Sequence, residues 1–253
     1  MILQKIARSI REQDWFVVVV ELLVVVVGLV MAFQVDRWRE AGNEREQEQN
    51  YLSRLTADIE SDLPAIQFAI ELQTIRLGMA KQLMAAVENP ETAVEDPVLF
   101  LAAIDQAAFT YTPLLASHTF EDLRSTGNMR LIRNQELKAV LFDYYGFDQS
   151  QGQYRPLEFK TEFKHFELVA GVLNYDQVRL LQDEIGYVTD VRIDEIRKLR
   201  VDNLEVLLAA KRLAERPGVR DWLPQIRRMQ IEQIMVHNRR IERAQAVLDI
   251  LEK

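Results

Sequence analysis

The sequence contains no cysteine, and it is also poor in histidine, glycine and proline, with three His, nine Gly and seven Pro in 253 residues. The absence of cysteine excludes disulfides, thiol catalysis and cysteine-based metal sites. So little Gly and Pro excludes collagen and a low-complexity chain. Basic residues are not in excess either, since 39 Asp and Glu outnumber 31 Lys and Arg and the net charge is −8. A nucleic-acid partner is therefore not expected, because phosphate contacts need a basic surface.

One extreme feature stands against this ordinary composition, the run WFVVVVELLVVVVGLVMAF over residues 15–33, which holds a single charge. A helix of this length spans roughly 28 Å, close to the thickness of the hydrocarbon core of a bilayer. Valine favours strands, but a lone strand would leave its backbone unpaired in lipid, so we expect a helix. Trp15 and Trp38 flank the run, as interfacial aromatic residues do. The sequence predicts a transmembrane helix over 15–35.

The residues that follow this helix bear on where it ends and how it is oriented. Asp36 and Arg37 are expected to hold its end at the interface, because charged groups resist insertion into lipid. The Lys and Arg residues divide equally between the two flanks: Lys5, Arg8 and Arg11 before the run, and Arg37, Arg39 and Arg45 after it. The following flank is also rich in acids, which leaves the N-terminal flank more positive. We expect a bacterial inner-membrane protein with a cytoplasmic N-terminus and a periplasmic domain over 36–253.

Two further features concern the N-terminal region. Residues 1–14 carry Ile2, Ile6 and Ile10 at four-residue spacing opposite basic side chains, a pattern typical of a helix on a lipid surface, although a plain cytoplasmic tail is the alternative. Val30-x-Ala32 loosely matches a signal-peptidase site. The apolar run is longer than a usual signal-peptide core, however, so an uncleaved signal-anchor is the better interpretation.

Glu21 is the most unusual residue of the apolar run, because it lies roughly 9 Å inside the expected membrane boundary. A carboxylate there is costly unless it is protonated, paired or turned toward a partner helix. Gly28 follows seven residues later on the same helix face and would allow another helix to approach closely. We interpret Glu21 and Gly28 as a membrane seam in a homo-oligomer. The alternatives are a proton-linked site and an acid that extends toward the near interface.

The remainder of the chain predicts an all-α domain, an antiparallel bundle of long helices without sheet. Apolar residues at spacings of three and four residues, with turn and capping residues between them, divide it into helices over 43–89, 96–109, 119–126, 134–171, 174–186, 188–215 and 219–251. Pro64 is expected to kink the first helix. Thr119 with Asp122 resembles a capping box, and Asn134 is expected to cap the helix that follows it.

Candidate sites in this domain are few. Aromatic residues concentrate in the helix over 134–171, where Tyr144, Tyr145, Phe163 and Phe166 form a candidate pocket for an apolar ligand; a bulky core is the favoured alternative. Glu162-x-x-His165 matches half of a di-iron motif, but the sequence has no second Glu-x-x-His, so we expect no metal or other cofactor. His237 falls on the apolar stripe of the last helix and is expected in the core. Phosphate-loop and hydrolase motifs are absent, so no catalytic residues are proposed.

Several short motifs carry a family resemblance. They are Gln34-Val35-Asp36-Arg37-Trp38 after the membrane helix, Tyr51-Leu52-x-x-Leu55-x-x-Asp58, Thr119-Phe120-x-x-Leu123-x-Ser125-x-Gly127-Asn128, Leu131-Ile132-x-Asn134-x-x-Leu137 and Tyr144-Tyr145. The chain resembles a domain-of-unknown-function family of bacterial single-pass membrane proteins, although Arg39 stands where Asn is common. The resemblance implies a membrane location and a helical fold, and it implies no activity. The corner over 125–134 is expected to be structural, with partner binding as the alternative.

Three hypotheses for the function follow. The first is a non-enzymatic, membrane-anchored scaffold or interaction protein that contacts membrane lipids and self-associates through its membrane helix, with another membrane protein as a further candidate partner. The second is a ligand-sensing helical domain, similar to the periplasmic bundles of chemoreceptors, that acts through a separate partner. An enzyme is the third, and it would require polar groups gathered in a cleft.

Overall fold

The computed structural model of the chain describes residues 15–185 and 193–252. Every regular element within these two ranges is helical and none is a strand, which confirms the all-α prediction. The segment expected to be amphipathic, residues 1–14, lies outside the described residues, as do residues 186–192.

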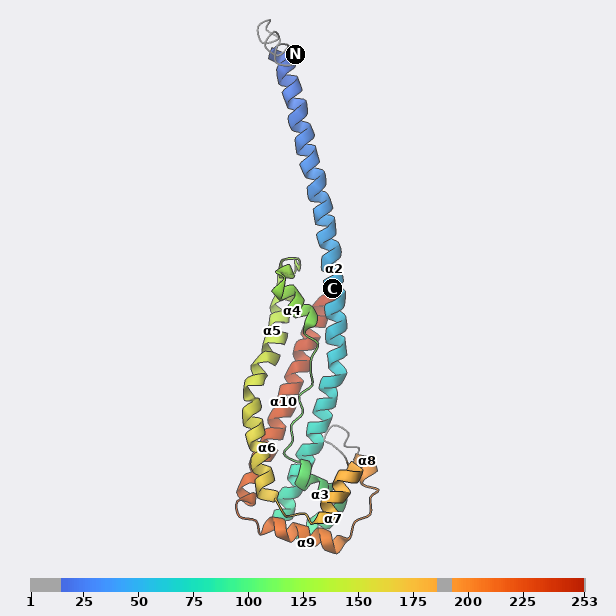
Figure 1. Cartoon of the computed structure of the whole chain (residues 1–253), viewed down its shortest axis with the longest axis vertical. Coiled ribbons are helices and arrows are strands. Elements are labelled where there is room, and N and C mark those ends of the chain that lie inside the picture. The colour runs from blue at the N-terminus through green and yellow to red at the C-terminus, as the bar shows by residue number, and fades with distance from the viewer. Residues whose placement is uncertain (1–14, 186–192, 253) are drawn as a thin grey trace.

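The dominant element is α2 (Trp15–Glu88), a single helix of 74 residues that would measure about 110 Å if straight. The predicted membrane helix and the predicted helix over 43–89 are therefore one continuous rod. Its N-terminal part projects beyond the rest of the molecule, and its C-terminal part forms one wall of the bundle (Figure 1). The helix continues through Pro64. Pro64 removes one backbone hydrogen bond, and the buried residues on both sides of it, Ile59 and Ile66, keep the helix packed.

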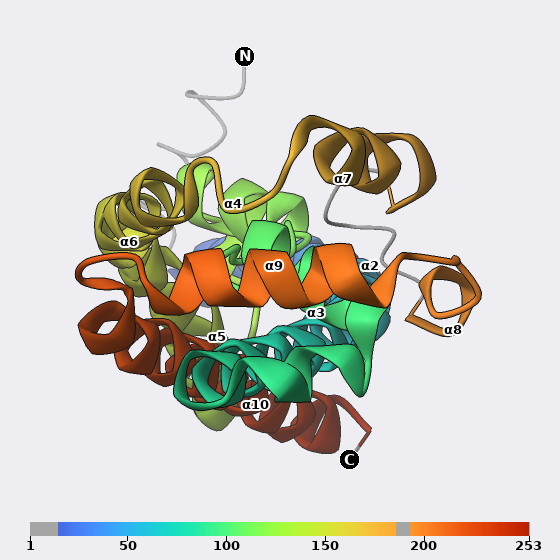
Figure 2. The same cartoon turned by 90° about the horizontal axis from the view of Figure 1, so that it is seen from below.

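After α2 the chain makes three more passes along the bundle (Figure 1). From the end of the bundle opposite the projecting part of α2, an extended segment over 107–117 runs back along the bundle. The elements in order are η1 (Pro90–Val94), α3 (Pro97–Gln106), α4 (His118–Ser125), η2 (Asn128–Arg130), α5 (Gln135–Gln151), η3 (Gly152–Tyr154), α6 (Arg155–Val169), α7 (Tyr175–Leu180), the π-helical turn η4 (Leu181–Ile185), α8 (Ile193–Ile196), α9 (Asn203–Ala214) and α10 (Val219–Leu251). α5 and α6 run antiparallel to α10, and α9 crosses the far end (Figure 2).

Most boundaries follow from local sequence. Asn134 caps α5 by accepting hydrogen bonds from the backbone N–H groups of Glu136 and Leu137, as predicted. Gly127 has φ +75°, a left-handed conformation that favours glycine, and it separates α4 from η2. The short η3 divides the helix predicted over 134–171 into α5 and α6.

Two local predictions were wrong. Helix α4 begins at His118 after Ser117, and no side chain caps it, so Thr119 does not form the expected capping box. Thr119 is instead fully buried, which places its side chain in the core rather than at the helix end. The long helix predicted over 188–215 is also interrupted: α8 ends at Ile196, and Asp202 caps a separate α9 by accepting a hydrogen bond from the Leu204 N–H.

The core is divided along the bundle into two apolar clusters. The cluster nearer the projecting rod surrounds Leu55 and Ile59, with residues of α4, α5 and the C-terminal end of α10. The farther cluster joins the end of α2 to α3, α9 and the start of α10. Between them the buried positions of α2 and α10 include several polar residues, among them Gln73, Arg76 and His237. This polar layer surrounds the extended segment 107–117 and positions the site described next.

Candidate functional site

The extended segment 107–117 occupies a place in the bundle where another helix would ordinarily lie. Its sequence explains the conformation: Thr110, Tyr111 and Thr112 have strand-type side chains, and Pro113 disfavours a helical residue before it. An extended backbone inside a bundle exposes N–H and C=O groups that cannot pair with each other. Such groups are costly when buried, so the surrounding helices must supply their partners.

Side chains from α2, α5, α6 and α10 supply those partners. Two pairs of residues act on neighbouring carbonyls: Gln73 and His237 donate to Tyr111 O at 3.4 and 3.1 Å, and Arg76 and Gln230 donate to Phe109 O at 3.3 and 3.0 Å. Further contacts extend this set: Glu162 Oε1 accepts from Thr110 N at 2.8 Å, Asp62 Oδ1 accepts from Ala116 N at 2.8 Å, and Tyr145 Oη donates to Ala116 O at 3.2 Å. The polar layer is therefore a scaffold for an irregular backbone.

Burial in this layer shifts the ionisation of its members. Burial is the main cause that lowers the pKa of Arg76 to about 10, against the opposing effect of the Glu162 charge. Burial also lowers the pKa of His237 to about 4, with the Arg240 charge acting in the same direction, and it lowers the pKa of His165. Burial raises the pKa of the Asp62 carboxyl, although hydrogen bonds from Ala116 and Tyr144 oppose it. The layer therefore holds neutral imidazoles.

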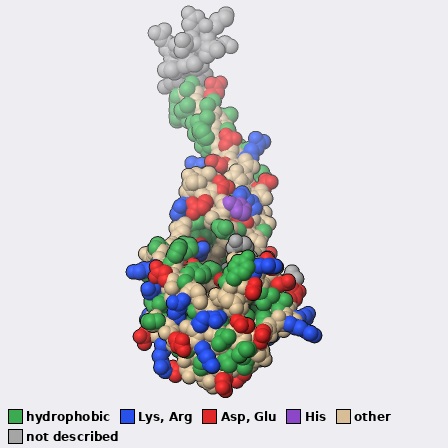
Figure 3. Space-filling view, turned by 60° about the horizontal axis from the view of Figure 1, so that its bottom comes forward, with side chains coloured by type: hydrophobic (Ala, Val, Ile, Leu, Met, Phe, Trp, Pro, Cys, Tyr) green, Lys and Arg blue, Asp and Glu red, His purple; other side chains and the backbone are tan. Residues whose placement is uncertain are grey.

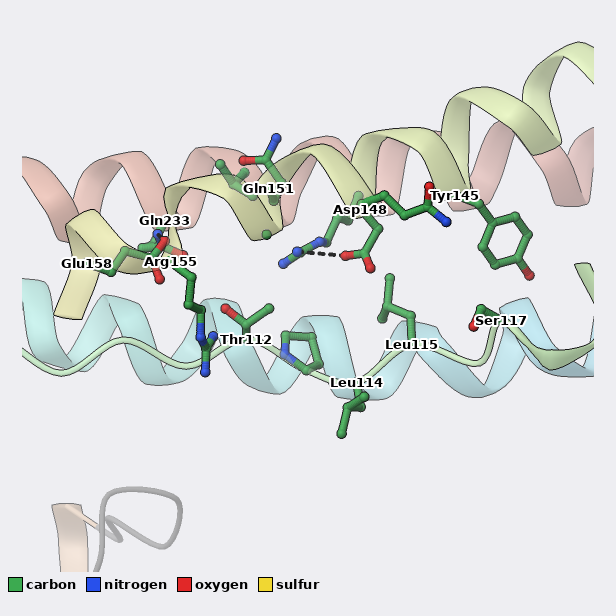
Figure 4. Close-up of a pocket in the computed structure, with 15 residues that line it drawn as sticks. Thr112, Leu114, Leu115, Ser117, Tyr145, Asp148, Gln151, Arg155, Glu158 and Gln233 are labelled. Carbon is green, nitrogen blue, oxygen red and sulfur yellow. Dashed lines mark hydrogen bonds and ion pairs between the residues drawn. The ribbon is translucent and has the colours of Figure 1, made fainter. Parts of the chain in front are cut away.

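One side of the polar layer opens to solvent as a groove of about 400 Å³, which we call the polar groove. Its walls are the extended segment from Thr112 to Ser117, the α5–α6 junction and α10 (Figure 4). Its charged side chains are Asp148, Arg155, Glu158 and Arg240. None of these four charged residues was singled out by its sequence pattern, and they come from positions up to 92 residues apart.

Arg240 forms the base of the polar groove. Its side chain is 2% exposed, and its Nη2 pairs with Asp148 Oδ1 at 2.8 Å (Figure 4). Its Nη1 donates to His237 Nδ1 at 2.9 Å, which fits a His237 whose Nε2 donates to Tyr111 O. Gln233 completes this wall by donating to Glu158 Oε1 at 2.6 Å. The base is thus held rigidly, and its charge is balanced by Asp148.

The four aromatic residues of the candidate apolar pocket do not meet in one cavity. Tyr144 and Tyr145 belong to the apolar cluster near the rod, where both are buried and Tyr144 donates to Asp62 Oδ2 at 2.7 Å. Phe166 packs against Phe109, with ring centroids 5.2 Å apart. Phe163 is 70% exposed. Only Tyr145 lines the polar groove, so the structure distributes these residues between core and surface.

The histidines likewise have local partners. His165 Nε2 donates to Ile104 O at 3.0 Å, while Glu162, the other residue of the half di-iron motif, binds the backbone of Thr110. His118 pairs with Asp58 at 3.1 Å. In the part of the chain that the structure describes, no group of three or more His, Cys, Asp or Glu residues is placed to hold a metal ion.

The predicted membrane residues all lie on the projecting part of α2. An 18-residue window of this helix has a mean hydropathy of 3.0 and is 0% buried, so the rest of the described chain covers none of it (Figure 3). Trp15 is 67% and Trp38 79% exposed. Apart from the adjacent residues and the nearby backbone of its own helix, no described heavy atom lies within 4 Å of the position that a Cβ at Gly28 would occupy. Glu21, Asp36 and Arg37 are also exposed on this rod.

Most of the short sequence motifs gather where the rod enters the bundle. Asn128 Nδ2 donates to Tyr51 Oη at 3.0 Å, and Tyr51 Oη donates to Asp122 Oδ2 at 3.2 Å. Next to them Arg130 pairs with α2 through Glu44 at 2.7 Å, and the Arg133 N–H donates to Glu48 at 2.6 Å. Leu131 and Ile132 are buried beneath this corner. The corner therefore fastens the α4–α5 connection to α2.

These features define the chain as an all-α bundle with one long apolar N-terminal helix, compatible with a single-pass membrane protein. The chain belongs to the family of unknown function DUF6090, whose model matches residues 21–154, more than half of its length. The matched range runs from Glu21 to the end of η3 and includes the corner motifs. Neither the curated proteins nor the solved structures gave a match.

Proposed function

We propose that the protein is a membrane-anchored, non-enzymatic scaffold or interaction protein that self-associates through its membrane helix. The observation that carries this proposal is the apolar start of α2, which no described part of the chain covers and which continues without a break into the bundle. An exposed apolar helix of this length is stable in lipid and costly in water. Because anchor and bundle share one helix, a contact made in the membrane would fix how neighbouring bundles are placed.

The direction of the seam supports self-association. Counted at about 100° per residue, Glu21 and Gly28 lie roughly 140–160° around α2 from Glu44, which faces the bundle corner. Ala32 follows Gly28 by four residues, and small residues at this spacing allow close helix packing in lipid. A second rod could therefore approach this side while the bundles point outward. Glu21 would then face its counterpart, where a protonated carboxyl can share a hydrogen bond.

We propose a non-enzymatic role because the buried His and Glu side chains of the bundle form hydrogen bonds with backbone groups. His165 and His237 donate to backbone carbonyls, and Glu162 accepts from the Thr110 N–H. Glu162 and His237 therefore support the extended segment, and His165 holds α3. A scaffold requires a rigid bundle, and this arrangement supplies one.

The test of self-association is the mass of the full-length protein in mild detergent. We expect a discrete oligomer, with Gly28→Leu and Glu21→Gln shifting it toward monomer. Val26→Leu is the matched control, since Val26 is exposed and lies roughly 160° from Gly28 on the same helix. A monomeric wild-type protein, or an oligomer that neither Gly28→Leu nor Glu21→Gln changes, would refute the seam.

The topology is tested separately by protease protection in bacterial cells that express the full-length protein with a C-terminal tag. We expect the tag to be lost when protease is added to spheroplasts and to survive in intact cells, because the proposal places the bundle in the periplasm. Survival of the tag in spheroplasts, with loss only after lysis, would place the bundle in the cytoplasm and overturn the proposed orientation.

A further inference from the structure

The polar groove contains two kinds of charged group. Asp148 and Arg240 neutralise each other at its base. Within the described chain, however, Arg155 makes no ion pair, and its guanidinium carbon lies 5.4 Å from the centroid of the Phe159 ring. Glu158 accepts hydrogen bonds from the neutral side chains of Gln233 and Thr110 and likewise has no cationic partner. The groove therefore presents one uncompensated cation and one uncompensated anion.

These two groups are separate although they are neighbours in sequence. Arg155 and Glu158 are three residues apart on α6, a spacing at which an ion pair forms readily. Instead the Arg155 side chain extends across the groove toward Thr112, while Glu158 stays beside Gln233 (Figure 4). Opposite charges held apart across a concave surface complement a molecule that carries both charges.

The wall formed by the extended segment adds hydrogen-bonding groups. The backbone of Thr112 to Leu115 makes no hydrogen bond within the described residues. The residues on either side of this stretch do: Tyr111 O accepts from Gln73, and the Ala116 N–H donates to Asp62. Leu114 is 98% exposed, whereas Leu115 packs against the apolar cluster near the rod and holds this part of the segment in place. Thr112 and Ser117 contribute hydroxyl groups to the same wall.

We propose that the polar groove is a binding site for a small zwitterion that carries an α-ammonium and a carboxylate group, as in a free amino acid or a short peptide. The carboxylate would bind Arg155, a guanidinium suited to planar carboxylates. The ammonium would bind Glu158. The unpaired backbone of Thr112 to Leu115 would hold the remaining polar atoms. A groove of about 400 Å³ is within the range of small-molecule sites.

The probes that test this site are chosen by charge. Mixtures of L-amino acids, and separately of dipeptides, are titrated into the full-length protein in detergent, and binding is followed by calorimetry and by thermal shift. We expect saturable binding of a member of one set, which also tells an amino-acid site from a peptide site. The same compound with its amine acetylated, or with its carboxylate amidated, is expected to bind at least about tenfold more weakly, since each derivative loses one charge-assisted contact.

Three variants place the binding in the groove. Arg155→Gln and Glu158→Gln are each expected to weaken binding by at least about tenfold, and Glu158→Gln keeps an oxygen that can accept from Gln233. Lys164→Gln is the matched control, because Lys164 is exposed on α6 and pairs with Glu167 rather than lining the groove. No saturation by any probe up to about 10 mM, or wild-type affinity in both groove variants, would overturn the proposal.

The zwitterion site does not rest on the proposed membrane seam. The groove is built from α5, α6, α10 and the extended segment, and no residue of the projecting rod lines it. Loss of binding in Arg155→Gln with an unchanged mass in detergent would support the groove alone. A monomeric protein that still binds a zwitterion would refute the seam and leave the groove supported.

Discussion

Acid is expected to destabilise the bundle through His237, whose imidazole is buried between the extended segment and Arg240. The ring is 0% exposed, its Nε2 donates to Tyr111 O, and its Nδ1 accepts from Arg240. Protonation would place a second positive charge against Arg240 and remove the acceptor that Arg240 uses. Burial first, and the Arg240 charge second, lower the pKa of His237 from 6.5 to about 4.

The sign and the size of the effect follow from this pKa. Between pH 6.5 and about 4 the unfolded chain binds a proton at His237 that the folded chain does not, so the free energy of unfolding decreases as the pH falls through this range. The difference between the two pKa values corresponds to about 3 kcal/mol, fully present above pH 6.5. His165, whose pKa burial also lowers, acts in the same direction.

The measurement is urea unfolding of the full-length protein in detergent at several values between about pH 4 and pH 7. His237→Gln keeps an amide that can reach the same partners and removes the titration, so we expect its stability to fall less toward acid by about 3 kcal/mol. Gln230→Met is the control: it removes donors to Ala107 O and Phe109 O and is expected to lower stability equally at every pH. An unchanged acid loss in His237→Gln would refute this account.

Three further predictions concern the bundle near the rod, each measured by the same unfolding assay. Ile59→Ala is expected to cost about 2–5 kcal/mol because it opens a cavity in a fully buried cluster, whereas Leu204→Ala at a 61% exposed position should change stability by less than about 0.5 kcal/mol; equal losses would contradict the assigned core. Asn134→Ala is expected to cost about 1 kcal/mol by removing the α5 cap, and Asn134→Asp should largely retain it; the reverse order would count against the cap. Glu44→Gln is expected to cost less than about 1 kcal/mol, since its ion pair with Arg130 is solvent-exposed, and a larger loss would show that this pair does more than fasten the corner.

Features that depend on neighbours in sequence were predictable. The apolar run over 15–33 has the length and composition of a membrane span whatever surrounds it, and the structure leaves it uncovered. Asn134 caps α5 because its side chain reaches N–H groups only two and three residues away. Gly127 separates α4 from η2 because glycine readily adopts a left-handed backbone conformation. Each of these signals acts within a few residues and needs no tertiary partner.

The apolar stripe predicted for α10 illustrates where this reasoning ends. Leu223, Ile226 and Leu248 lie in the core as the pattern indicates. In the middle of the helix the buried positions are instead Gln230, Gln233, His237 and Arg240, while Ile234 and Ile241 are only partly covered. Periodicity assumes that a buried face meets another apolar face. Here it meets an extended backbone, whose carbonyl groups select hydrogen-bond donors.

The composition and local patterns of the sequence alone determined that this chain is helical, that one long segment is suited to lipid, and where several helices begin. Tertiary structure decided which helices lie together around the segment 107–117, and it brought Asp148 and Arg155 to the same groove as Arg240. The physical reason is the separation along the sequence over which each interaction acts. Capping and hydropathy act within a helix, but the partner of a buried charge or an unpaired carbonyl is set by residues that only folding brings within hydrogen-bond distance.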